Sequence, residues 1–150
     1  MSGATTYEKD VVAWASEQAR LLRSGQLSAL DIEHIAEEIE DVGKSEQREL
    51  MSRMVVLLAH LLKWQYQPRR RGASWSTTIR VQRKDIALAL KEAPSLRARL
   101  SDLEWLSLAW DKALAQAQAE TEPEAIAFPE TWSWSLEDAL RDGWLPPELN

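Results

Sequence analysis

The 150-residue chain contains no cysteine, and this absence removes several kinds of chemistry at once. Disulfides, thiolate nucleophiles and cysteine-ligated zinc or iron–sulfur sites all need the missing thiol. Glycine is also scarce. The five glycines are scattered singly, so the chain has neither a phosphate-cradling glycine-rich loop nor a Gly-x-Ser-x-Gly nucleophile elbow. The sequence therefore carries no signature of a catalytic nucleophile, and we expect no cofactor.

Long apolar runs are missing as well. The longest uncharged apolar run, Met54 to Leu62, is about half of the roughly 20 residues that a membrane-spanning helix requires. The first six residues carry neither a basic patch nor an apolar stretch, so no secretory signal is visible. We therefore expect a cytoplasmic protein without a membrane partner, and its length fits one domain covering residues 1–150.

The chain has a net charge of −6, which disfavours a dedicated nucleic-acid binder because such proteins neutralise phosphates with surplus lysine and arginine. The charge is unevenly distributed, however. Residues 31–49 carry eight acids against two bases, and residues 102–150 carry eleven against two. Residues 63–84, the basic stretch, carry seven bases and no acid. This segregation allows the basic stretch to serve an anionic partner.

Helical periodicity runs through almost the whole chain, and no strand pattern persists. Apolar residues spaced by three and four, with glycine, proline and serine signals, predict an all-α fold. We expect a compact bundle packed around a long third helix, which is apolar nearly all round between Met54 and Leu62. The expected helices cover residues 6–24, 32–42, 45–65, 74 or 76 to 93, 95–117 and 135–141, with stops at Gly25, Gly43, Pro68 and Pro94.

Several blocks of sequence resemble a known bacterial family. The most specific block runs from Leu57 to Pro68 and reads Leu-Leu-Ala-His-Leu-Leu-Lys-Trp-Gln-Tyr-Gln-Pro. Together with the acidic block at 37–40 and the Ser-Trp pair at 74–75, it resembles the family called domain of unknown function twenty-nine. The resemblance covers nearly the whole chain and implies a compact all-helical bacterial protein. It implies no activity, cofactor or catalytic residue.

One acidic helix face has the spacing of a possible metal site. Asp31, His34, Glu38 and Asp41 recur at intervals of three and four. A metal site in a helical bundle normally needs matching ligands on a facing helix, and the only other histidine, His60, has no carboxylate at helical spacing. The face is therefore interpreted as a solvated acidic surface, and no metal is expected.

A hydrolase or nuclease is the alternative to a non-catalytic protein. His60 could act as a general base because its unperturbed titration lies near neutrality. It would need an orienting acid from another helix, such as Glu37 or Glu38, with Lys63 beside it. The simpler reading is a histidine that is hydrogen-bonded within the structure.

The basic stretch is the main functional candidate, because it combines cations, aromatic rings and the start of a helix. Unpaired backbone N–H groups at a helix N-terminus favour anions, and indole rings can stack on bases or guanidinium groups. Three outcomes stay open for its arginines: pairing with the acids of residues 37–41, binding an external anion, or simple solvation. The candidate partner-binding residues are Lys63, Trp64, Tyr66, Arg69, Arg70, Arg71, Ser74, Trp75, Arg80 and Arg83.

The chain is rich in tryptophan, with eight against a single phenylalanine. Tryptophan suits both the edges of a core and interfaces, because it joins a large apolar ring to one N–H donor. Trp105 and Leu108 lie off the main stripe of their helix, which leaves a homo-oligomer possible. The best hypothesis from sequence is a non-catalytic interaction module that binds a protein or anionic partner.

Overall fold

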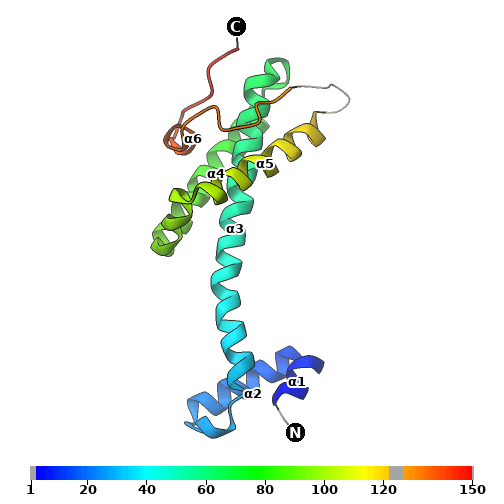
Figure 1. The fold of residues 1–150 in the computed structure, drawn as a ribbon, viewed down its shortest axis with the longest axis vertical. Helices are drawn as coiled ribbons and strands as arrows, with labels where there is room; N and C mark the ends of the chain where they lie inside the picture. The colour runs from blue at the N-terminus through cyan, green and yellow to red at the C-terminus, as the bar shows by residue number, and fades with distance from the viewer. Residues whose placement is uncertain (1–2, 122–126, 150) are drawn as a thin grey trace. The chain divides into compact units, whose positions relative to one another are not determined.

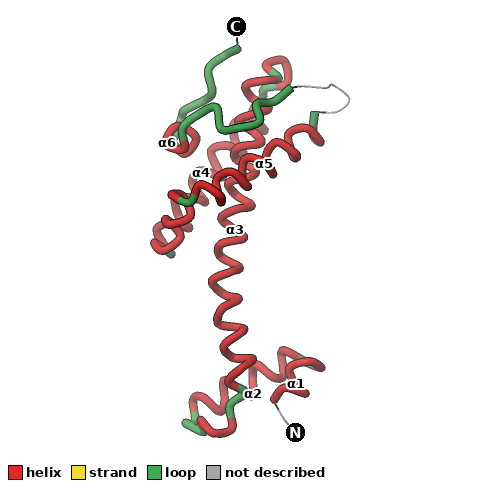
Figure 2. Tube along the Cα trace, viewed as in Figure 1, coloured by secondary structure: helices red, strands yellow, loops and turns green. Residues whose placement is uncertain are grey.

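A computed structural model describes residues 3–121 and 127–149, and these residues form helices and loops with no strand (Figures 1 and 2). The predicted all-α fold with a long central helix is confirmed. The helices group into two compact units, Met1–Glu46 and Gln47–Asn150, called here the N-terminal and C-terminal units. The α-helices are α1 (Gly3–Lys9), α2 (Val11–Arg23), α3 (Ile32–Tyr66), α4 (Ala73–Glu92), α5 (Leu103–Glu120) and α6 (Leu136–Leu140).

The first predicted helix, residues 6–24, is divided in two at Asp10. This residue is extended, and its carboxylate accepts a hydrogen bond from the Ala13 N–H at 3.1 Å, so it caps α2. The predicted stop at Gly25 is correct. Gly25 has a φ of +73°, and the amides of Gly25 and Gln26 bond back to the carbonyls of Leu22 and Leu21. This is the Schellman arrangement, which favours glycine because of the positive φ.

The predicted stop at Gly43 is wrong, because α3 continues through it from Ile32 to Tyr66. Glycine permits a helix to end but does not force it to, and Gly43 lacks the positive φ that Gly25 and Gly143 adopt. The second and third predicted helices are therefore one helix. It ends before Pro68, as expected, since proline disfavours the helical conformation in the residue that precedes it.

Two helix starts in the C-terminal unit also differ from the prediction. α4 begins after Gly72 without a side-chain cap, rather than at Ser74 or Ser76. Residues 94–101 form a 3₁₀ segment, η3 (Pro94–Ser101), so α5 begins only at Leu103. Its cap is Asp102, whose carboxylate accepts from the amides of Glu104 and Trp105. The remaining 3₁₀ turns are η1 (Leu27–Ala29) and η2 (Pro68–Arg70).

The hydrophobic core lies in the C-terminal unit and surrounds the second half of α3. The side chains of Met54, Leu57, Leu58, Leu61 and Leu62 are fully buried, as expected from a segment that is apolar nearly all round. α4 contributes Ile79, Ile86 and Leu90 to this core, and α5 contributes Ala109, Trp110, Ala113 and Ala117.

The segment after α5 is held to this core by polar side chains. Gln65 is buried, and its side-chain Nε2 donates to the Pro147 carbonyl at 2.9 Å. Its side-chain Oε1 accepts a hydrogen bond from Trp134 Nε1 at 3.1 Å. Ser135 caps α6 by accepting from the Asp138 amide, as the sequence predicted. This C-terminal segment therefore forms one wall of the grooves described next.

Candidate functional site

The basic stretch covers the end of α3, η2 and the first three turns of α4. Three of its seven cations bind to other groups within the fold. Lys63 is one of them, with an exposure of 5%. Its ammonium group pairs with the Glu120 carboxylate of α5 and lies 5.1 Å from the ring centroid of Trp75. Burying an ammonium group is costly without such partners, so Lys63 serves the packing of α3 against α5.

Arg71 is the second cation held within the structure. Its Nε donates to the Trp64 carbonyl at 2.6 Å, and its guanidinium lies 5.4 Å from the Trp64 ring centroid. Its Nη1 also forms an ion pair with the Glu148 carboxylate, at 3.4 Å. These contacts tie the C-terminal tail to the end of α3.

Arg83 is the third, and it is as buried as Lys63. Its Nε donates to the Ala139 carbonyl at 2.9 Å, and its Nη2 donates to the Trp144 carbonyl at 2.7 Å. Burial lowers the pKa of this guanidinium, although Asp142 favours the charged form. Arg83 therefore holds α6 and the loop that follows it against α4.

The other four cations of the stretch, Arg69, Arg70, Arg80 and Lys84, have exposed side chains. None of them forms an ion pair with a carboxylate among the residues that the structure describes. Arg70 donates to the side-chain carbonyl of Gln67 at 3.1 Å, which leaves its charge uncompensated. The candidate surface is therefore divided into buried cations that stabilise the fold and exposed cations that face solvent.

Two of the exposed cations border a groove of about 450 Å³ between α4 and the loop after α6. Leu145 gives the groove an exposed apolar side chain, the nearly buried Ile79 also lines it, and Arg80 and Lys84 supply positive charge. Asp142 is the one carboxylate in its lining, set against three cations. The full lining of this basic groove is Ser76, Ile79, Arg80, Arg83, Lys84, Asp142, Gly143 and Leu145.

The aromatic residues of the basic stretch lie mostly at the edge of the core. Trp64 and Tyr66 are half-buried and pack against it, and the Tyr66 ring meets Phe128 edge-on at 5.3 Å. Trp75 is also half-buried and lies beneath Lys63. Ser74 is exposed in the first turn of α4. The three rings thus serve packing, and Tyr66 also lines a shallow pocket with Arg69 and Arg70.

The residues of the enzyme hypothesis are divided between the units. Glu37 and Glu38 belong to the N-terminal unit, where Glu38 accepts a 2.6 Å hydrogen bond from the Tyr7 hydroxyl. His60 belongs to the C-terminal unit, and its Nδ1 donates to the Val56 carbonyl at 2.8 Å. Burial lowers the pKa of His60, so the neutral ring is favoured.

The carboxylate that acts on the pKa of His60 is that of Glu120, and nothing in the sequence pointed to this residue. Burial alone would raise the pKa of Glu120, but hydrogen bonds from Lys63 and Gln116 lower it below its usual value. Glu120 lies 60 residues along the chain from His60, so no local spacing could identify it. Its strongest partner is Lys63, which makes it a counter-charge for a buried cation.

The acidic face that was considered as a metal site forms hydrogen bonds within the N-terminal unit. His34 Nδ1 lies 2.8 Å from Asp31, and its ring stacks on Tyr7 with centroids 4.0 Å apart. Burial would raise the pKa of Asp31, but hydrogen bonds from His34 and Trp14 lower it. The described residues contain no group of three or more histidine or acidic side chains that could hold a metal ion.

A second groove, of about 410 Å³, lies beside α5 and is lined mainly by leucine and tryptophan. Its indole N–H groups all bond inside the fold: Trp110 to Pro129, Trp132 to Leu106, and Trp134 to Gln65. Trp105, which the sequence placed off the main stripe, is half-buried against the core, whereas Leu108 is exposed.

None of the described helices has the length and hydropathy needed to cross a membrane.

Comparison with known proteins identifies one family. The search of curated proteins and the search of solved structures each returned no match. The family model described as "Domain of unknown function DUF29" matches residues 6–145, which includes most of both units. The sequence blocks that suggested this family all lie within that range, and the chain therefore belongs to the DUF29 family.

Proposed function

We propose that this chain is a non-catalytic interaction module of the bacterial cytoplasm that binds an acidic segment of a partner protein through the basic groove. The observation that carries the proposal is the exposure of Arg80 and Lys84 beside the exposed apolar side chain of Leu145. An extended or helical segment that alternates acidic and apolar side chains matches both features. Arg69 and Arg70, exposed on η2, line a separate shallow pocket with Tyr66 and are not part of the basic groove.

A protein partner fits this surface better than a nucleic acid does. The C-terminal unit carries fourteen basic and fourteen acidic residues, whereas residues 1–46 carry four basic and ten acidic residues. Nucleic-acid affinity depends on neutralising many phosphates together, and the four exposed cations of the basic stretch, on a unit with no net charge, supply few such contacts. A short acidic segment needs only a few charged contacts, and contact with the apolar surface adds to its affinity.

The test uses the full chain and a fluorescein-labelled peptide of alternating glutamate and leucine, followed by fluorescence anisotropy. We expect salt-sensitive binding that weakens by about tenfold in Arg80→Ala/Lys84→Ala, as expected when two solvated ion pairs are lost. Arg97→Ala/Lys112→Ala removes the same charge from exposed positions outside the groove and serves as the matched control.

The proposal fails if the wild type does not bind the peptide, or if both double variants weaken binding equally. A labelled single-stranded oligonucleotide is titrated in parallel. Tighter binding of the oligonucleotide than of the peptide would replace the protein partner by a nucleic acid.

A further inference from the structure

A small pocket of about 200 Å³ lies where α3 ends and η2 begins. This pocket, called here the η2 pocket, is lined by Tyr66, Gln67, Pro68, Arg69 and Arg70, none of which is acidic. Arg69 and Arg70 are exposed, and neither pairs with a carboxylate among the described residues. The pocket therefore carries two positive charges that the described part of the fold does not neutralise.

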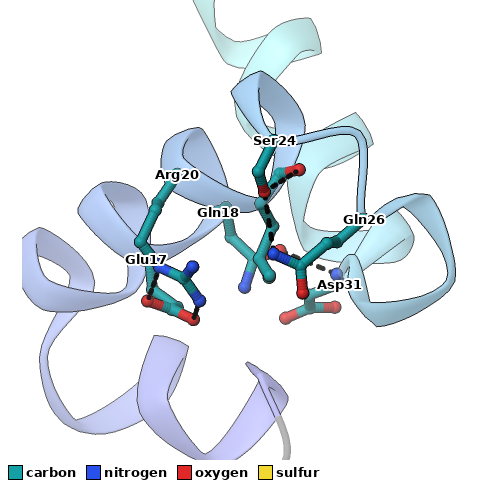
Figure 3. Close-up of polar contacts among 7 residues, drawn as sticks. Glu17, Gln18, Arg20, Ser24, Gln26 and Asp31 are labelled. Carbon is teal, nitrogen blue, oxygen red and sulfur yellow. Dashed lines mark hydrogen bonds and ion pairs between the residues drawn. The ribbon is translucent and has the colours of Figure 1, made fainter.

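Gln67 differs from the two other glutamines that are buried among the described residues. Gln18 accepts a hydrogen bond from the Asp31 amide at 2.8 Å (Figure 3), and Gln65 uses both ends of its side-chain amide. Gln67 is 5% exposed, and its Oε1 accepts from Arg70 Nη1 at 3.1 Å. Its Nε2 is buried without a hydrogen-bond partner in the described part of the chain. An unpaired buried donor destabilises a fold, so this atom calls for an acceptor.

The end of α3 does not account for the two exposed arginines. The last carbonyl groups of a helix carry partial negative charge and attract cations. At this helix end the role falls to Arg71, whose Nε donates to the Trp64 carbonyl at 2.6 Å. Arg71 also reduces the repulsion that an open helix end would exert on an anion. Arg69 and Arg70 are therefore left for an acceptor outside the helix.

The polar groups that line the η2 pocket select the chemistry of a ligand. Guanidinium groups and the Nε2 end of a glutamine are donors only, and the Tyr66 hydroxyl can also donate. A ligand that offers acceptor oxygens in several directions matches such a set. Two uncompensated cations match the charge of about −1.5 to −2 on a phosphate group at neutral pH, whereas a carboxylate carries one charge and has both oxygens in one plane.

The size of the η2 pocket limits the ligand further. Sites that enclose a drug-sized molecule measure roughly 300–1,000 Å³, and this pocket is smaller. It is therefore suited to one anionic group rather than to a whole nucleotide.

We propose that the η2 pocket binds a phosphate group, either as inorganic phosphate or as the phosphomonoester of a small molecule. Arg69 and Arg70 bind its oxygens, and Gln67 Nε2 donates to one of them. Arg70 is exposed and bonds to a neutral oxygen of Gln67, so it turns toward the phosphate and opens the amide to it. The site is independent of the acidic segment proposed for the basic groove, because the two share no lining residue.

The first test is a titration of the ¹⁵N-labelled full chain with inorganic phosphate at low ionic strength, followed by NMR. We expect a Kd of about 1 mM or below, with shifts concentrated at the backbone amides of residues 66–71 and at the side-chain amide of Gln67. Acetate should bind at least about tenfold more weakly, because it carries one charge. Glycerol 3-phosphate is titrated in parallel, and the tighter of the two phosphates identifies the free ion or the phosphomonoester as the source.

The second test removes the groups that hold the phosphate. Arg69→Ala/Arg70→Ala should weaken binding by at least about tenfold with helix content unchanged by circular dichroism, because both side chains are exposed. Gln67→Glu keeps the shape of the side chain, lets Arg70 pair with the new carboxylate, and should abolish binding because a donor becomes a charged acceptor. Arg80→Ala/Lys84→Ala is the matched control, since it removes two exposed cations from the basic groove, and it should change the Kd for phosphate by less than about twofold.

The proposal is overturned if phosphate does not saturate the shifts below about 10 mM, or if the shifts spread evenly over the exposed cations of the chain. Equal weakening by both double variants, full binding by Gln67→Glu, or acetate binding as tightly as phosphate overturns it as well. A failure of the acidic peptide to bind the basic groove changes none of these outcomes, because they are measured at residues 66–71.

Discussion

Arg83 offers the sharpest test of how the C-terminal segment is held, because its guanidinium is buried with carbonyl oxygens as its direct partners. Arg83→Met keeps much of the side-chain volume and removes both donors. The Ala139 and Trp144 carbonyls then lose their hydrogen bonds, which were 2.9 and 2.7 Å long. Hydrogen bonds from a charged donor contribute about 1.5–3 kcal/mol each, so their loss costs roughly 3–6 kcal/mol.

Part of this cost is offset, because the variant no longer buries a charge with incomplete compensation. We therefore expect a net loss of about 2–4 kcal/mol in the free energy of unfolding, measured by urea denaturation with circular dichroism. Hydrogen exchange should also quicken at residues 139–147. Arg83→Lys should give an intermediate loss, since one ammonium group cannot reproduce the planar, two-donor geometry.

Arg80→Met is the matched control, because Arg80 lies on the same helix and is exposed. Its effect should stay within about 0.5 kcal/mol. If Arg83→Met destabilises the protein no more than Arg80→Met does, then Arg83 does not anchor the segment around α6 and the reasoning is wrong.

The remaining predictions concern the cluster around Lys63. Glu120→Gln should destabilise the protein more than Lys63→Met does. The first variant leaves a buried ammonium group without its counter-charge, whereas the second replaces that group by an apolar side chain. Urea denaturation of both variants measures which loss is larger. Because the pKa of Glu120 is lowered in the folded protein, its carboxylate stabilises the fold above about pH 4.5, the pKa in the unfolded chain. This stabilisation is lost as the pH falls through the folded-state pKa, so Glu120→Gln should flatten the acid side of the curve of stability against pH. His60, whose pKa burial lowers from 6.5, should titrate below that value by NMR. Because the unfolded chain then binds the proton more readily, stability should fall as the pH drops below about 6.5, and His60→Gln should remove this component.

Local signals in the sequence were enough to predict the fold class and several helix ends. The stops at Gly25, Pro68 and Pro94 follow from backbone preferences that act within one or two residues, and the structure confirms all three. The apolar run from Met54 to Leu62 likewise predicted the central helix, because a helix that is apolar all round needs cover on every side. The predicted helix end at Gly43 is wrong, because glycine permits a helix to end without forcing it to, and α3 continues on both sides of this residue.

The basic stretch was visible in the sequence as charge, but composition could not show which of its cations are available to a partner. Lys63 and Arg83 are buried because their counterparts, Glu120 and the carbonyls around α6, come from segments more than 50 residues away. Similarly, the spacing of Ile32, Ile39 and Val42 is typical of the buried face of a helix, yet these residues are exposed. Periodicity is a property of one helix and can be read locally. Burial depends on which distant segments reach that helix, and only the tertiary structure decides it.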